Sequence, residues 1–248
     1  MGVVPFDLPL PTGVLLVAAA VTALAAALQG VVGFGYAIVA VPLLSLLDPR
    51  LAPVPQILTA LPLTAVTAWR ERGHIDGRGA AWILVGRVPG LALGAVLVAV
   101  ASTRVLDGLI GASVLAGVAC LSTRAPSRRT RSIDATAGAL SGVAGYVSGI
   151  GGPPLALLYR HATGAIIRST LGALFAFGIV VTVATRTVLG QITALDVRIG
   201  LLLLVPVLAG TWASRFLHDV VSARVLRVTV LALSALSGLS LLLRAWQP

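Results

Sequence analysis

One arginine stands inside an otherwise apolar stretch of the chain. Arg87 lies in the segment ILVGRVPG (residues 83–90), seven residues into an apolar block, with glycine and proline around it. An ionisable side chain is costly in apolar surroundings and usually serves a function there. A guanidinium can bind two oxygens of an anion at once, so Arg87 is a candidate counter-ion for an anionic ligand. The alternative is a side chain that extends to a nearby polar interface.

Two glycine-rich motifs offer a second kind of anion chemistry. Glycine lets the backbone turn so that N–H groups face a cavity, and a helix N-terminus carries partial positive charge that suits an anion. The alternative is that these glycines only allow helices to pack closely. The candidates are Gly33, Phe34, Gly35 and Pro42 in the first motif, and Gly149, Gly151, Gly152 and Pro153 in the second.

Two further polar residues are candidates for ligand contact. Gln56 lies in the apolar block after the first motif, and its alternative role is a hydrogen bond to backbone or to a neighbouring helix. Arg168 comes shortly after the second motif, at the start of another apolar block. It either completes an anion site together with the motif amides or anchors its block at an interface.

The composition predicts a membrane protein. Of the 248 residues, 58% are apolar and 10% are charged, whereas an ordinary soluble domain carries roughly a quarter charged residues. The mean hydropathy is +1.02. The net charge of +10 comes from arginines that lie between the apolar blocks. This distribution is typical of anchors at membrane edges and excludes a nucleic-acid partner.

The residues that catalysis or cofactors require are sparse. The chain has one cysteine and three widely separated histidines, without metal-ligand spacing. It has no lysine, so a phosphate-binding loop of the nucleotide type cannot form. We therefore expect no cofactor, no metal and no enzymatic activity.

The apolar blocks predict an all-α fold that crosses the bilayer about eight times. The blocks are 12–47, 53–69, 80–101, 105–121, 135–159, 169–189, 199–216 and 225–243. A helix over residues 12–47 would be about 54 Å long, and a bilayer core is only about 30 Å thick. Because its glycines and Pro42 weaken a helix, we expect this block to break into a span followed by a half-helix or a re-entrant loop.

The two halves of the chain resemble each other. Shifting the sequence by 112 residues pairs Gly33 with Gly145, and a shift of 120 pairs Asp76 with Asp196. We therefore divide the chain into a first repeat (1–123), a basic linker (124–131) and a second repeat (132–248). The repeats are parallel if each motif block crosses once and inverted if each block turns back. By the positive-inside rule, both arrangements place the linker in the cytoplasm.

The motif pair resembles the TauE/SafE (TSUP) family of sulfite and organosulfonate exporters. The resemblance rests on GFGYAIVAVPLL (33–44) and GIGGPP (149–154), and it extends over nearly the whole chain. Many family members carry three successive glycines in the second motif, whereas here Pro153 takes the third place. The resemblance implies transport of a small sulfur-containing anion or a related organic acid.

The function that we expect is secondary transport of a small anion by alternating access between the repeats, because tandem repeats with broken helices are typical of such transporters. The expected location is the plasma membrane, and the expected partners are the lipid bilayer and a small anionic substrate. Protons are the candidate coupling ion. The sequence is compatible with either a monomer or a homo-oligomer. The alternative is an integral-membrane scaffold or subunit of a membrane complex that transports nothing.

Overall fold

A computed structural model describes residues 10–122 and 129–217, and a few positions between 232 and 243. The described residues form helices without a strand, which confirms the all-α membrane fold. The helices are α1 (Thr12–Val32), α2 (Tyr36–Leu47), α3 (Val54–Arg70), α4 (Gly77–Val100), α5 (Thr103–Ser122), α6 (Arg131–Ser148), α7 (Gly152–Leu158), α8 (Gly164–Val188) and α9 (Ala194–Leu217). Short 3-10 helices, η1 (Pro49–Leu51) and η2 (Arg72–His74), flank α3.

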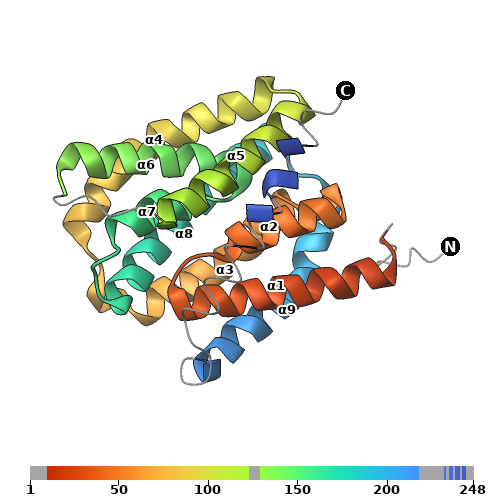
Figure 1. The fold of residues 1–248 in the computed structure, drawn as a ribbon, viewed down its shortest axis with the longest axis horizontal. Coiled ribbons are helices and arrows are strands. Elements are labelled where there is room, and N and C mark those ends of the chain that lie inside the picture. Colours follow the sequence, from red (N-terminus) through yellow and green to blue (C-terminus); the bar gives the residue numbers. More distant parts are fainter. Residues whose placement is uncertain are drawn as a thin grey trace.

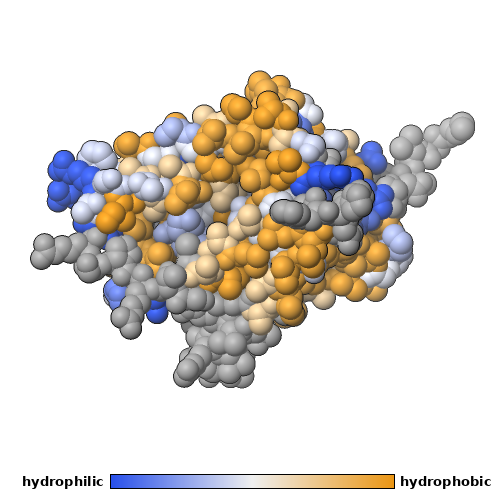
Figure 2. All heavy atoms as spheres, turned by 45° about the horizontal axis from the view of Figure 1, so that its top comes forward, coloured by the Kyte–Doolittle hydropathy of each residue, from blue (hydrophilic) through white to orange (hydrophobic). Residues whose placement is uncertain are grey.

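Five of the described helical segments are long and apolar enough to cross a bilayer. They are Thr12–Val32, Pro49–Arg70, Gly77–Val100, Gly164–Val188 and Ala194–Phe216. The expected last span (225–243) lies mostly outside the described residues. Large hydrophobic side chains such as Leu24 (71% exposed) point outward. Hydrophobic residues cover the middle of the face in Figure 2, and hydrophilic residues gather at its two ends, as a surrounding bilayer requires.

The first apolar block breaks where its glycines predict. The helix α1 ends at Gly33, whose φ of +94° is in the left-handed region, and α2 begins after Gly35, whose φ is +119°. The helix α6 likewise ends at Gly149, with a φ of +75°. Gly33 and Gly149 therefore occupy equivalent positions at the ends of α1 and α6. The shift of 112 residues instead pairs Gly33 with Gly145.

Each broken block turns back on itself. The helix α2 packs against α1, and α7 packs against α6. The side-chain Oε1 of Gln29, near the end of α1, accepts a hydrogen bond of 3.0 Å from the backbone N–H of Tyr36, the first residue of α2. The break is thus a tight hairpin and not a kink in one long helix.

The helix ends gather in two groups. The linker end holds Glu71, Asp76, Arg129, Tyr159 and Arg168, which are joined by ion pairs and hydrogen bonds. The opposite end holds Ser45, Val98, Leu106, Val147 and Arg186, which line one pocket. The helix α1 runs toward the linker end, since Gly33 lies against Arg168, and α6 runs away from it. The two halves of the chain therefore run in opposite directions.

The halves pack through exchanged helices. The helix α4 of the first half lies along α6 of the second, and α9 of the second lies along α1 of the first (Figure 1). Glycines bring α4 and α6 close, because a Cβ atom on Gly86 would lie only 1.7 Å from the carbonyl oxygen of Ala135. Close packing is therefore the role of these helix glycines. Between the two helix pairs lie α2, α3, α7 and α8 (Figure 1).

Candidate anion-binding site

A cavity lies between the two broken blocks, with a volume of about 50 Å³ open to water. Residues of α1 to α4 and of α6 to α8 line it. They are Gln29, Gly35, Tyr36, Ala37, Ile38, Val41, Gln56, Ile57, Ala60, Thr64, Arg87, Gly145, Gly149, Ile150, Gly151, Gly152, Phe175, Gly178, Ile179 and Thr182. Both breaks and the buried arginine thus meet at one cavity.

The guanidinium of Arg87 is enclosed at this cavity. The residue is 3% exposed, so its side chain does not extend to an interface. Its Nη1 donates a short hydrogen bond to the hydroxyl of Ser141, and its Nε has no hydrogen-bond partner. None of the acidic side chains that the structure describes forms an ion pair with it.

Two residues of α8 shape the space around Arg87. The guanidinium carbon lies 5.7 Å from the centre of the Phe175 ring, within the range of a cation–π contact. A Cβ atom on Gly178 would lie 2.4 Å from Nη2 of Arg87. The absence of a side chain at Gly178 therefore makes room for the guanidinium.

Ser141 connects Arg87 to the second break. Its hydroxyl accepts from Arg87 and donates to the backbone carbonyl oxygen of Gly151. The bond runs from α6 to the residue just before α7. Arg87 and the second break therefore share one hydrogen-bonding partner.

A buried polar network supports the first break. The hydroxyl of Tyr36 donates to Oε1 of Gln56 at 2.6 Å and lies 2.7 Å from the hydroxyl oxygen of Thr59. The amide of Gln56 donates to the carbonyl oxygen of Leu51 at 3.1 Å. Together with the bond from Tyr36 to Gln29, these contacts fix the start of α2 against α1 and α3.

The cavity is suited to an anion. Among the described residues that line it, Arg87 is the buried cation and none is a carboxylate. A buried charge needs a partner, because its transfer out of water is otherwise strongly unfavourable. Among the residues that the structure describes, no cluster of His, Cys, Asp or Glu could hold a metal ion.

Six of the residues predicted from the sequence line the cavity, and five do not. Those that line it are Gly35, Gln56, Arg87, Gly149, Gly151 and Gly152. Those that do not are Gly33, Phe34, Pro42, Pro153 and Arg168.

The residues outside the lining have other neighbours. Gly33 packs on Arg168, and the Nε of Arg168 donates to Glu71 at 2.7 Å at the linker end. Pro42 is buried inside α2. Pro153 lies 2.7 Å from the position of a Cβ atom on Gly117 in α5, so it faces away from the cavity.

Sequence reasoning missed part of the lining. Gln29 and Thr182 are buried polar residues inside apolar helices, and a search for isolated polar residues in the apolar blocks would have found both. Thr64, whose place in the block after the first motif suits either a substrate contact or a hydrogen bond to the backbone, also lines the cavity. No sequence signal separates Gly178 from the many other glycines, because its role depends on contact with a different helix.

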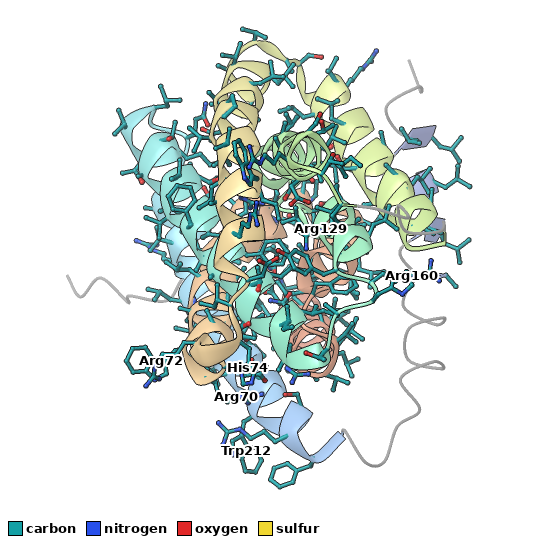
Figure 3. The ribbon with its side chains drawn as sticks, turned by 90° about the vertical axis from the view of Figure 1, so that its left-hand side faces the viewer. Arg70, Arg72, His74, Arg129, Arg160 and Trp212 are labelled. Atoms are coloured by element: carbon teal, nitrogen blue, oxygen red, sulfur yellow. The ribbon has the colours of Figure 1, made fainter. Side chains whose placement is uncertain are left out.

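A polar network lies at the linker end, which Figure 3 views with Arg129 near its centre. Asp76 accepts from the hydroxyl of Tyr159 at 2.9 Å and from Arg129 at 3.2 Å. Partial burial acts to raise the pKa of Asp76, but bonds from the Gly79 N–H and from Tyr159, with the charge of Arg129, outweigh it and lower that pKa below its usual range. The network joins the residue before α4, a residue two positions before α6 and the residue after α7.

One known protein family matches most of the chain. A family model described as sulfite exporter TauE/SafE matches residues 18–241. No curated protein and no solved structure matches the chain significantly. The matched region contains the breaks in both blocks, Arg87 and every described residue that lines the cavity. The chain therefore belongs to the TauE/SafE family of sulfite exporters.

Proposed function

We propose that this protein is a secondary transporter of a small oxyanion, sulfite or a sulfonate, which binds to Arg87 in the cavity between the two broken blocks. Membership of the family implies an exporter-type anion transporter. The observation that supports the substrate class is the buried guanidinium of Arg87, whose Nε has no hydrogen-bond partner and which forms no ion pair with a described acidic residue. An oxyanion supplies both the missing charge and the missing acceptor.

The size of the cavity supports a compact substrate. One water needs roughly 10–15 Å³ of such volume, and the cavity offers about 50 Å³. This volume suits sulfite or the head of a short sulfonate better than a bulky organic acid. The tail of a sulfonate would have to extend along the apolar side of the cavity, past Ile57 and Ile179.

The opposed directions of the two halves support alternating access between inverted repeats. In this mechanism the segments 1–123 and 132–248 are the repeats, and each contributes one broken block to a site near the middle of the membrane. Rocking of one broken block against the other would open the cavity to each end in turn. The contacts of Arg168 with Glu71, and of Asp76 with Arg129 and Tyr159, would close the linker end.

The distribution of arginines supports a cytoplasmic linker in the plasma membrane. Of the described arginines other than Arg87, eight lie near the linker end and four near the opposite end. The first group is Arg70, Arg72, Arg78, Arg129, Arg131, Arg160, Arg168 and Arg215, and the second is Arg50, Arg104, Arg186 and Arg198. Arginine-rich loops stay on the cytoplasmic side.

Protons are the coupling ion in this proposal, and the substrate itself carries them. The described lining of the cavity includes neither a carboxylate nor a histidine. The conjugate acid of sulfite is weak, so protonation of the bound anion would alter its attraction to Arg87 without a protein proton site.

Flux of sulfite into proteoliposomes, with and without a pH gradient, tests the proposal. We expect saturable flux that the gradient changes and that Arg87→Gln abolishes. Folded protein that carries neither sulfite nor any short sulfonate would instead support a scaffold.

A further inference from the structure

A second pocket lies at the end opposite the linker, with a volume of about 200 Å³. The ends of α2, α4, α6 and α8 meet there with the start of α5. Ser45, Val98, Val147 and Arg186 are among its lining residues. The function proposed above makes no use of this pocket.

Arg186 is the buried cation of this pocket. It is 5% exposed. Its Nη2 donates to the backbone carbonyl oxygen of Tyr146 at 2.7 Å, and its guanidinium lies 4.8 Å from the centre of the Tyr146 ring. Its Nε has no hydrogen-bond partner, and no described carboxylate lies within ion-pair distance of it. Arg186 therefore has the same unsatisfied donor and unpaired charge as Arg87.

The second pocket continues the central cavity along α8. Phe175, Gly178, Ile179 and Thr182 line the central cavity, and they lie on one face of the helix. Arg186 follows Thr182 by four residues, which places it on the same face about 6 Å further along the helix. On α6, Val147 of the second pocket precedes Gly149 of the central cavity by two residues.

We propose that Arg186 forms a second, outer anion site that receives the oxyanion from Arg87 on its way to the end opposite the linker. The ligand class is the same small oxyanion, bound through the Nε edge of the guanidinium. The inference rests on the proposed function, because it places two arginines in series along one transport route.

Nearby carboxylates make this outer site weaker than the central one. Asp107 also lines the pocket, and its side chain or backbone already interacts with another group. Asp196 is close enough for its charge to act on Arg186, and it accepts hydrogen bonds from Thr193. Negative charge beside an anion site lowers its affinity, and a site on a transport route must release its ligand as well as bind it.

Binding stoichiometry tests the outer site. Titration of the purified protein with sulfite should give one tight and one weak site per chain. Arg186→Gln should remove the weak site, leave the tight dissociation constant within about twofold, and slow flux by roughly tenfold or more, because a buried anion loses its charged partner. Arg87→Gln should remove the tight site. Lysine in place of Arg186 should keep the fold and restore part of the weak binding.

A pair of valines on α4 provides a test that leaves Arg186 in place. Val98→Phe fills the outer pocket, whereas Val96→Phe adds the same bulk at a position that is 57% exposed. We expect Val98→Phe to slow flux and remove the weak site with tight binding intact, and Val96→Phe to behave as wild type.

The outcomes separate the two proposals. The outer site is overturned if Arg186→Gln and Val98→Phe both keep the wild-type stoichiometry and flux. The proposed function still stands in that case, provided that Arg87→Gln loses the tight binding. Failure of the wild-type protein to bind sulfite overturns both.

Discussion

Gly178 of α8 leaves the space that the guanidinium of Arg87 of α4 occupies. A Cβ atom at Gly178 would lie 2.4 Å from Nη2, 2.6 Å from Nε and 2.9 Å from Cζ of Arg87. These distances are shorter than a carbon atom can approach without displacing its neighbour. The position of the arginine in the cavity thus depends on a glycine from another helix.

Replacement of Gly178 by alanine should therefore weaken anion binding without changing any charge. The added methyl group pushes the guanidinium away from its place beside Ser141, and misplacement of a binding group by about 1 Å can cost a large factor in activity. We expect the dissociation constant for sulfite to rise by about tenfold, measured by titration calorimetry. Gly13→Ala is the matched control, because a Cβ atom there meets nothing within 4 Å. Equal affinities of the two variants for sulfite would show that Gly178 does not position Arg87 for anion binding.

The two neighbouring glycines of the second motif should differ in their tolerance of alanine. A Cβ atom on Gly151 would lie 2.7 Å from the carbonyl oxygen of Ser141, whereas one on Gly152 would first meet Phe175 at 3.7 Å. We expect Gly151→Ala to lower the free energy of unfolding by about 1–3 kcal/mol, as overpacking does, and Gly152→Ala to change it much less. Thermal unfolding in detergent measures both, and a reversed order would contradict the described packing of the second break.

Removal of the Tyr36 hydroxyl should destabilise the first break. Tyr36→Phe leaves Oε1 of Gln56 without its 2.6 Å hydrogen bond in a buried place, at a cost of about 1–3 kcal/mol. A protein of this size loses roughly 2–4 °C of Tm for each kcal/mol. Tyr146→Phe is the control, since the hydroxyl of Tyr146 makes only a 3.5 Å contact with Gln191. A Tm for Tyr36→Phe no lower than that of the control would count against the network.

Acid should weaken the linker end through Asp76. Because the pKa of Asp76 is lower in the folded protein than its usual value of 3.8, its contribution to stability is present above that value and is lost as the pH falls through the folded value. Asp76→Asn should remove this part of the acid dependence. Unfolding temperatures recorded from about pH 6 to about pH 3 measure the difference. Parallel pH profiles of the wild type and the variant would show that Asp76 contributes nothing to the acid dependence of stability.

The sequence predicts the local features of this fold well. Long apolar blocks predict the membrane helices, and the glycines around Gly33 predict the break between α1 and α2, because glycine acts on the backbone of its own segment. The position of Arg87 inside an apolar block marks it as unusual but allows either a buried charge or a side chain that extends to an interface, and its 3% exposure shows that it is buried. Each of these features depends on residues that are close in sequence.

Contacts between distant segments explain what the sequence does not predict. Arg168 resembles a site residue because it follows the second motif, but Glu71, far away in sequence, holds it in an ion pair at the linker end. Ser141 and Gly178 look unremarkable in sequence and become important only because α6 and α8 pack beside Arg87. Helix packing between the halves therefore determines which polar residues meet.

The affinity of Arg87 variants for sulfite tests the central claim most directly. Arg87→Gln should raise the dissociation constant by about 30-fold or more, since loss of a buried charged partner costs 2–5 kcal/mol. Arg87→Lys should lie between Arg87→Gln and the wild type, because it keeps the charge without the bidentate geometry. Arg198→Gln, a change at an exposed arginine, should bind as the wild type does. Unchanged sulfite affinity in folded Arg87→Gln would contradict the account.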